Sequence, residues 1–344
     1  MSDANEDVVD RLLAHYQRTH PLWQVRDGGA MLVNHGTMAI DALWELGFAD
    51  DAHADALVAK YYPDRLRPFV MGTPLSEDAP FGDEATIAGW VATFDAAIAR
   101  DGADSVLRRV LPKLFDGVMG GSLHGLVRTG HAVRMLARRD SELRRREVAF
   151  GLGLWAGTFQ RLPGEPGGGT QTPSHVLATI PAVPMHERVP GILSARAAPL
   201  SGNAAFAAAI GAMDLAVDVE RELTAIEEVV ARLLLTHPQA KNTYLHAMTT
   251  TSLFRVLAPY VDAHAFGAFV RALAAVHAVS VEGPPFDGDA PPSDPRELAR
   301  DAAATLDDHT IKLVATAIRE AARDDCAAPD VILLAAARSL RGGL

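Results

Sequence analysis

Residues 202–235, GNAAFAAAIGAMDLAVDVERELTAIEEVVARLLL, decide the fold class of this chain. Their apolar side chains recur with the period of an amphipathic helix, and His237–Pro238 ends the pattern. The same period returns along most of the sequence, whereas no segment shows a strand-like alternation strong enough to predict a sheet. We therefore predict an all-α protein with a single large multi-helix domain over residues 1–344.

Helical spacing extends over most of the remaining chain. Helices are expected over residues 7–17, 29–47, 52–61, 84–99, 103–115, 121–138, 142–160, 241–258, 262–280, 295–322 and 328–340. Two stretches rich in Pro and Gly, residues 162–202 and 282–295, are expected as long loops, the first lying over one face of the domain.

Composition excludes several classes of protein. The chain has 344 residues, 49% of them hydrophobic, which is ample for a large core, and a net charge of −11, which argues against nucleic-acid binding. One cysteine, Cys326, allows no intramolecular disulfide and no cysteine-based zinc or iron–sulfur site. The acidic N-terminus lacks a signal-peptide pattern and no apolar run reaches membrane-spanning length, so we expect a soluble cytoplasmic protein.

Familiar catalytic motifs are absent. The run Gly151–Gly157, GLGLWAG, resembles a dinucleotide fingerprint, but its spacing is wrong and it lies in a helical pattern, where small residues usually serve close helix packing. There is no HExxH, no Glu-x-x-His, no P-loop and no GxSxG, so zincins, ferritin-like di-iron bundles, P-loop enzymes and α/β-hydrolases find no support.

Histidines within apolar helices are the most informative polar residues. A single buried histidine is usually a hydrogen-bonded core residue. Because imidazole is the commonest metal-ligand side chain, several such residues in one helical protein favour a metal site. The six are His35, His124, His131, His246, His277 and His309.

The segment Asp308–Lys312 is the sharpest of these contexts. His309 and Lys312 are three residues apart and share a helix face. Burial lowers the pKa of a lysine, and a neutral amine can combine with carbon dioxide to give a carbamate that a metal can hold, which arginine cannot do. The alternative is an ordinary surface ion pair between Lys312 and Asp308, and the spacing alone does not choose between them. The rarity of lysine, four among 32 basic residues, gives Lys312 additional interest.

A second histidine-bearing segment contains an arginine. His124 and His131 are two helical turns apart, and Arg128 lies between them on a similar face. An arginine beside a metal can hold an anionic substrate oxygen. The alternative is a core histidine beside an arginine whose head group reaches solvent.

Taken together, the motifs resemble the questin oxidase-like family, found in fungal polyketide pathways and among actinobacterial homologues. Four segments spread over nearly the whole chain carry the resemblance in the family's order: Asn34–Ala39 with Ala42–Leu43 and Leu46–Gly47, Ser122–Arg134, Leu245–Thr249 and Asp308–Lys312.

The resemblance implies oxygen-dependent cleavage of an anthraquinone-type ring at a mononuclear non-haem iron, Fe(2+). It implies four histidine ligands and one carboxylated lysine; on this sequence they are His35, His124, His246, His309 and Lys312. It also raises NADPH as a reductant.

Three further residues are predicted around this site. His131 is expected near the metal but outside the ligand set. Arg128 and Tyr244 are expected as polar anchors for a flat aromatic substrate in a mostly apolar pocket. The leading hypothesis is thus an iron-dependent oxygenase that uses O2 on a polycyclic aromatic metabolite. The alternatives are a metal-dependent hydrolase with a carbamylated lysine and a non-catalytic, small-molecule-binding helical protein.

Overall fold

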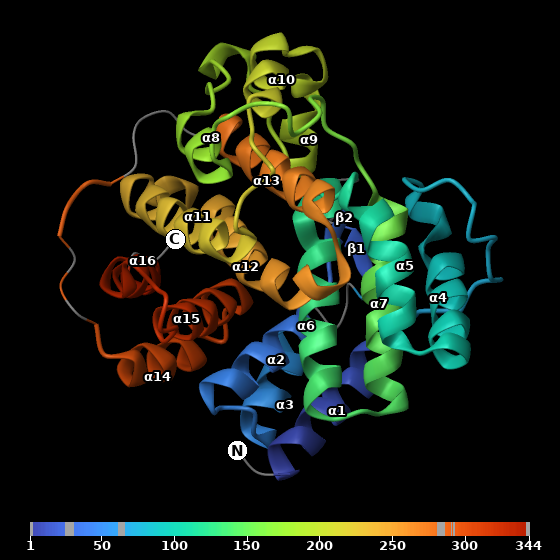
Figure 1. The fold of residues 1–344 in the computed structure, drawn as a ribbon. Coiled ribbons are helices and arrows are strands. Elements are labelled where there is room, and N and C mark those ends of the chain that lie inside the picture. The colour runs from blue at the N-terminus through green and yellow to red at the C-terminus, as the bar shows by residue number, and fades with distance from the viewer. Residues whose placement is uncertain are drawn as a thin grey trace.

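Helices make up almost all of the regular structure in a computed structural model that describes residues 3–24, 31–60, 66–280, 286–289, 291 and 293–341. The all-α class is confirmed (Figure 1). Within the described residues the α-helices are α1 (Asp3–Tyr16), α2 (Gly36–Leu46), α3 (Asp51–Lys60), α4 (Ile87–Asp101), α5 (Ala103–Phe115), α6 (His124–Arg138), α7 (Glu142–Thr158), α8 (Pro173–Thr179), α9 (Leu193–Ala197), α10 (Ala204–Gly211), α11 (Val219–Thr236), α12 (Lys241–Leu257), α13 (Ala263–Ala278), α14 (Pro295–Thr305), α15 (Asp308–Ala321) and α16 (Pro329–Arg341).

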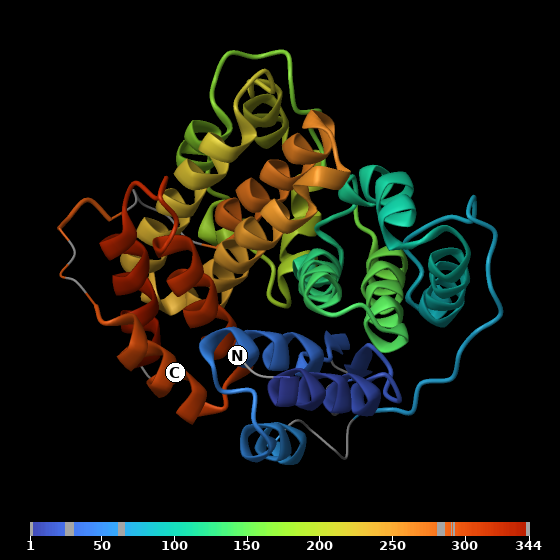
Figure 2. The ribbon, with the colours of Figure 1, turned by 60° about the horizontal axis from the view of Figure 1, so that its bottom comes forward.

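Four helices form a closed ring at the centre of the molecule. Helix α2 packs against α6, α6 against α12, α12 against α15, and α15 returns to α2. The N-terminal helices α1 to α3 lie at one end, α4, α5 and α7 on one side and α14 to α16 on the other, while α8 to α10 cap the opposite end (Figures 1 and 2). The ring brings together segments that are far apart in the sequence.

Small residues let these helices approach closely. A Cβ added to Gly130 on α6 would lie 2.8 Å from the Leu253 side chain on α12. On α7, a Cβ at Gly153 would lie 2.5 Å from the Val91 side chain of α4, and one at Gly151 would lie 2.7 Å from the Thr129 side chain of α6. The packing interpretation of the GLGLWAG run is therefore confirmed.

Two predicted long helices are interrupted. Residues 202–235 form α10 and α11, which are separated at 212–218 because the Asp218 side chain accepts a hydrogen bond from Arg221 N and caps a new helix. Residues 295–322 form α14 and α15, because Leu306 adopts a left-handed conformation with φ of 50° and Asp307 caps α15 through Thr310 N. Aspartate caps inside an apolar repeat explain both breaks.

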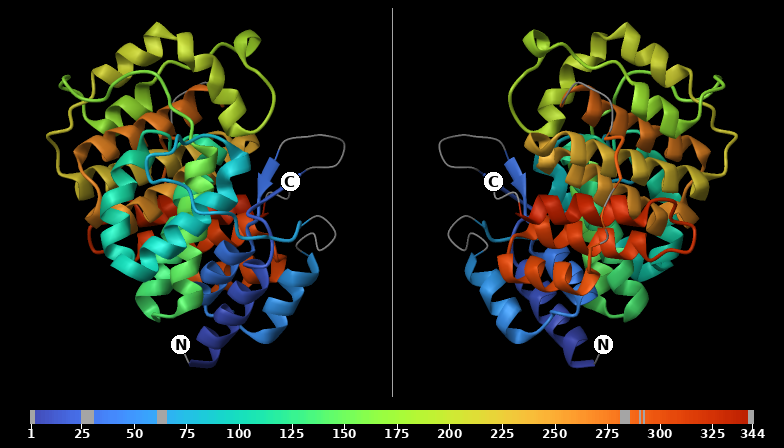
Figure 3. Two further views of the ribbon diagram at one scale, coloured as in Figure 1. Left: turned by 90° about the vertical axis from the view of Figure 1, so that its right-hand side faces the viewer. Right: turned by 90° about the vertical axis from the view of Figure 1, so that its left-hand side faces the viewer.

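A small hairpin replaces the start of one predicted helix. Strands β1 (Leu22–Gln24) and β2 (Met31–Val33) pair antiparallel, with Leu22 opposite Val33, and α2 starts only at Gly36. Strands of three residues are too short to show alternation. The hairpin stands at one edge of the molecule (Figure 3). Residues 29 and 30 of the predicted helix lie outside the described residues.

The two predicted loops differ from each other. Residues 162–202 are not a continuous loop, since they contain α8, α9 and 3-10 turns at 185–187 and 198–202. The described part of 282–295 ahead of α14 is non-helical, and residues 282–285, 290 and 292 lie outside the described residues. Among the helices that the structure describes, none combines the length and apolar character needed to cross a membrane.

Candidate metal centre

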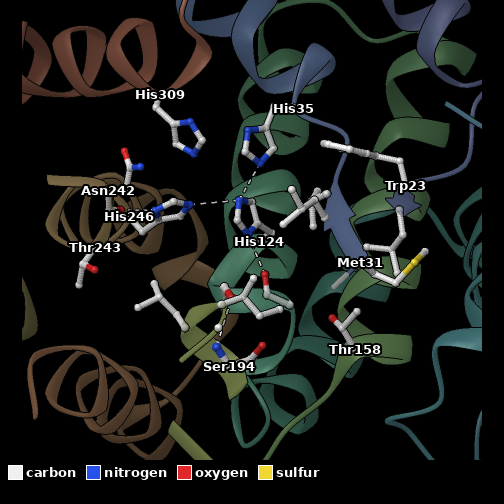
Figure 4. Close-up of a pocket in the computed structure, with 18 of the residues that line it drawn as sticks. Trp23, Met31, His35, His124, Thr158, Ser194, Asn242, Thr243, His246 and His309 are labelled. Carbon is white, nitrogen blue, oxygen red and sulfur yellow. Dashed lines mark hydrogen bonds between the residues drawn. The ribbon is translucent and has the colours of Figure 1, made fainter. Parts of the chain in front are cut away.

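Each helix of the central ring contributes one histidine to a single cluster. His35 directly precedes α2, His124 begins α6, His246 lies in the first half of α12, and His309 is the second residue of α15. Their imidazole rings turn toward one another (Figure 4). The Nε2 atom of His124 lies 2.8 Å from Nε2 of His35 and 3.2 Å from Nε2 of His246. A ring nitrogen of His309 lies within 4.8 Å of ring nitrogens of His35 and His124.

Hydrogen bonds on the outer side of three rings fix their tautomers. Nδ1 of His124 contacts the Gly121 carbonyl at 2.7 Å, Nδ1 of His246 contacts the Asn242 carbonyl, and Nδ1 of His35 contacts the Asp308 carboxylate. Carbonyl and carboxylate oxygens only accept, so Nδ1 of each ring carries the hydrogen. In the neutral rings, the three Nε2 atoms then face one another with bare lone pairs.

Such an arrangement fits a cation. The lone pair of His124 Nε2 lies about 3 Å from those of His35 and His246 and is repelled by both, because no hydrogen lies between them. With metal–imidazole bonds of about 2.1 Å, adjacent ligand nitrogens on one ion lie about 3 Å apart, as these do. The all-imidazole donor set suits iron, zinc or copper.

Burial favours the neutral form of three rings, those of His35, His124 and His246. It lowers the pKa of His35 to about 4, with the charge of Lys312 acting in the same direction and Asp308 opposing it. Burial and then the neighbouring histidines hold the pKa values of His124 and His246 well below the usual range for histidine. Neutral imidazole is the form that binds metals.

Behind the cluster, Asp308 connects three of its neighbours. Its Oδ2 atom accepts from His35, lies 3.3 Å from Lys312 Nζ and lies 3.4 Å from His309 Nδ1. Burial opposes ionisation of Asp308, but its interactions with His35, His309 and the Lys312 amine keep its pKa well below the usual carboxyl range. Asp308 thus orients His35 from behind, as carboxylates commonly do for metal-binding histidines.

The sequence left two alternatives for Lys312: a buried amine able to form a carbamate, or a surface ion pair with Asp308. The structure shows features of both. Lys312 pairs with Asp308 as the ion-pair alternative requires, but its side chain is only 2% exposed and therefore not a surface pair. Its Nζ atom lies 3.5 Å from Nδ1 of His35, behind that ring. Burial lowers the pKa of Lys312, while Asp308 opposes the shift.

Strained backbone is concentrated next to two of the histidines. Among the described residues, the non-glycine residues with positive φ are Ser122 (57°), Leu123 (71°) and Leu306 (50°). The first two immediately precede His124, and Leu306 lies three residues before His309. Left-handed conformations of such residues are uncommon and tend to persist at functional sites, where surrounding contacts enforce them.

Gly125 offers a test of how tightly the start of α6 is held. An added Cβ would lie 2.5 to 2.7 Å from Trp155 on α7, including its Cα atom. We expect Gly125→Ala to lower the free energy of unfolding by about 1–3 kcal/mol, as overpacking does. Urea unfolding measures this, with Gly202→Ala as the control because a Cβ there meets nothing within 4 Å. Equal stabilities of the two variants would contradict the packing described.

The histidine cluster opens into a cavity of about 570 Å³, a volume typical of small-molecule sites. The hairpin provides apolar wall residues, including Trp23 and Met31, and Ile192 and Leu193 add to them. Gln160, Ser194, Asn242 and Thr243 supply polar groups. Figure 4 shows Ser194 on the opposite side of His124 from His35.

The predicted anchors lie elsewhere. Arg128 is buried in an ion pair with Glu147, with Nε and Oε1 2.8 Å apart, and Tyr244 Oη lies 2.6 Å from Nδ1 of His277. Neither lines the cavity, so the contact with substrate predicted for them disagrees with the structure. Arg128 lies one helical turn after His124, but its side chain is taken up by Glu147 on α7. Tyr244 precedes His246 by only two residues and so lies on another face of α12.

His131 lies two helical turns after His124 on α6, outside the histidine cluster. Its Nδ1 atom is 2.7 Å from Asp41 Oδ2, and it does not line the cavity. The sequence analysis considered Asp308 only as an ion-pair partner of Lys312. It did not predict that Asp308 orients His35. Its position next to His309 at a helix start was the available signal.

Comparison with models of known protein families gives no match, and comparison with curated proteins gives none either. The relation to the questin oxidase-like family therefore remains an expectation from the motifs.

Proposed function

We propose that this protein is a mononuclear non-haem iron oxygenase that acts on a polycyclic aromatic metabolite with O2. The observation that carries the proposal is the set of three bare, buried Nε2 atoms, with His309 beside them, at the wall of a cavity large enough for such a substrate. His35, His124, His246 and His309 would hold the ion. A ferrous ion bound there would supply a redox-active centre for reaction with dioxygen.

The chain's own residues would hold and shield the substrate. Trp23, Met31 and Leu193 offer apolar surface for a flat ring system, and they limit the access of water. Asn242 and Thr243 place polar groups next to His246, where they can accept or donate hydrogen bonds to substrate oxygens. The resemblance of the sequence motifs favours oxidation over the other chemistries that an imidazole site can support.

Dioxygen chemistry needs a coordination position that the protein leaves open, and nitric oxide tests for it without knowledge of the substrate. We expect anaerobic iron-loaded protein to give the paramagnetic resonance signal of a ferrous nitrosyl when nitric oxide is added. If protein that holds iron gives no ferrous nitrosyl signal, the proposal that it is an oxygenase is wrong. Uptake of dioxygen with a panel of hydroxyanthraquinones, with and without NADPH, then tests the substrate class and the need for a reductant.

Carboxylation of Lys312 is part of the proposal, supported by the burial of its amine. In protein prepared with carbon-13 bicarbonate and loaded with diamagnetic zinc, we expect a carbamate carbon resonance that is absent from Lys312→Arg. If wild type and variant give the same spectrum, Lys312 remains an ammonium paired with Asp308, and the four histidines alone hold the ion.

A further inference from the structure

Charged side chains of opposite sign line different parts of the cavity. Asp307 and Asp308 line it beside His309, at the start of α15. Arg196, on α9, lines it as well, and α9 is also the helix of Ser194, which lies beyond His124 as seen from His35 (Figure 4). Glu84 adds one exposed carboxylate to the wall. The cationic end is therefore separate from the carboxylates of α15.

Arg196 is fixed in place but not neutralised. Its Nη2 atom donates to the Val279 carbonyl at 2.6 Å and lies 3.3 Å from Ser280 Oγ, at the C-terminal end of α13. No ion pair joins it to any carboxylate of the described residues, and both of its hydrogen bonds to described residues are made by Nη2. A half-buried guanidinium that is held through Nη2 and keeps the N–H groups of Nε and Nη1 free to donate is preorganised to receive an anion.

A purely structural explanation for Arg196 is a cap on α13. Cations near the C-terminus of a helix are stabilising, and Arg188 donates to the Ser280 carbonyl at 2.9 Å in the same region. Only Arg196 of these two lines the cavity. A cap would affect stability alone, whereas an anion site would also affect which ligands bind.

We propose that Arg196 binds an acidic group of the substrate, a carboxylate or phenolate, at the end of the cavity remote from α15. The proposal rests on the proposed function, since it assumes that the reacting part of the same molecule lies at the histidine cluster. The substrate is then an aromatic acid whose anionic group lies on the α9 side of its ring system. The free N–H groups of Arg196 can donate charge-assisted hydrogen bonds to the oxygen of either anion.

The test compares two probes of the same shape, 2-naphthoate and neutral 2-naphthamide, by calorimetric titration. Metal-free protein is used, so that no bound ion can take up the carboxylate. We expect wild type to bind 2-naphthoate about tenfold or more tightly than 2-naphthamide, as for a hydrogen bond between charged groups. Arg196→Gln should abolish the preference for 2-naphthoate, and Arg196→Lys should keep part of it. Arg188→Gln removes only the neighbouring cation and should leave the preference unchanged.

Thermal unfolding of the same variants separates this role from capping. A stable Arg196→Gln protein that retains the preference for 2-naphthoate would overturn the inference, as would a wild type that shows none. If Arg196→Gln fails to fold, an unchanged preference in Arg188→Gln together with a weakened preference in Arg196→Lys supports the inference.

Metal content is measured separately. Protein that binds no metal but prefers 2-naphthoate contradicts the proposed function alone, and protein that binds metal without the preference contradicts this inference alone.

Discussion

Replacing His124 by alanine is expected to abolish tight metal binding. His124 is the central ring of the cluster, because its Nε2 atom is within 3.2 Å of both His35 and His246. Without it the remaining nitrogens have no common neighbour. We expect the dissociation constant for iron to rise by at least about a hundredfold, since even partners behind a ligand alter affinity by about 10–100-fold.

The same substitution should remove the stabilisation that metal gives. A ligand present at a thousand times its dissociation constant stabilises the folded state by about 4 kcal/mol. Thermal unfolding with and without chelator should therefore show a large shift for wild type and a much smaller one for His124→Ala. His264→Ala is the control, because His264 is half exposed and pairs with Asp116 away from the cluster. A His124→Ala protein as sensitive to chelator as wild type would contradict the site.

The second large effect is expected for Asp308→Asn. The change removes the carboxylate that accepts from His35 and that, in metal-free protein with Lys312 uncarboxylated, faces the buried ammonium of Lys312. An ammonium left without its counter-ion in a dry interior is costly, and we expect metal-free protein to lose about 3 kcal/mol of unfolding free energy. Metal affinity should fall about 10–100-fold, because His35 loses the group that orients it.

A double-mutant cycle separates the two consequences. In Asp308→Asn/Lys312→Met the unpaired ammonium is gone, so denaturant unfolding should show much of the lost stability restored. Metal affinity should stay low, since the partner of His35 is still missing. If adding Lys312→Met to Asp308→Asn does not restore stability, the loss does not come from an unpaired Lys312 ammonium. The buried ion pair described here would then be wrong.

Helix periodicity was sufficient to predict the fold class, because nearly every element buries one apolar face. It failed where a short polar side chain ends a helix inside an apolar run. Asp218 and Asp307 each cap a new helix, and the intact hydrophobic spacing around them concealed the break. The β1–β2 hairpin was missed because strands of three residues have no readable period.

For the site, the sequence supplied the residues but not their arrangement. His35, His124, His246 and His309 were predicted as one set from motif order, and the structure brings all four together. Their convergence depends on the closed ring of α2, α6, α12 and α15, which no local pattern encodes. For the same reason Arg196 was not recognised, since it lies in a segment expected to be loop.

The central claim is that four histidines hold one metal ion. Elemental analysis of protein purified anaerobically tests it most directly, on wild type, His124→Ala and His309→Ala. We predict one iron per chain in wild type and little or none in either variant. Two zinc ions per wild-type chain would favour a hydrolase, metal-free wild type would favour a binding protein, and full iron content in both variants would contradict the claim itself.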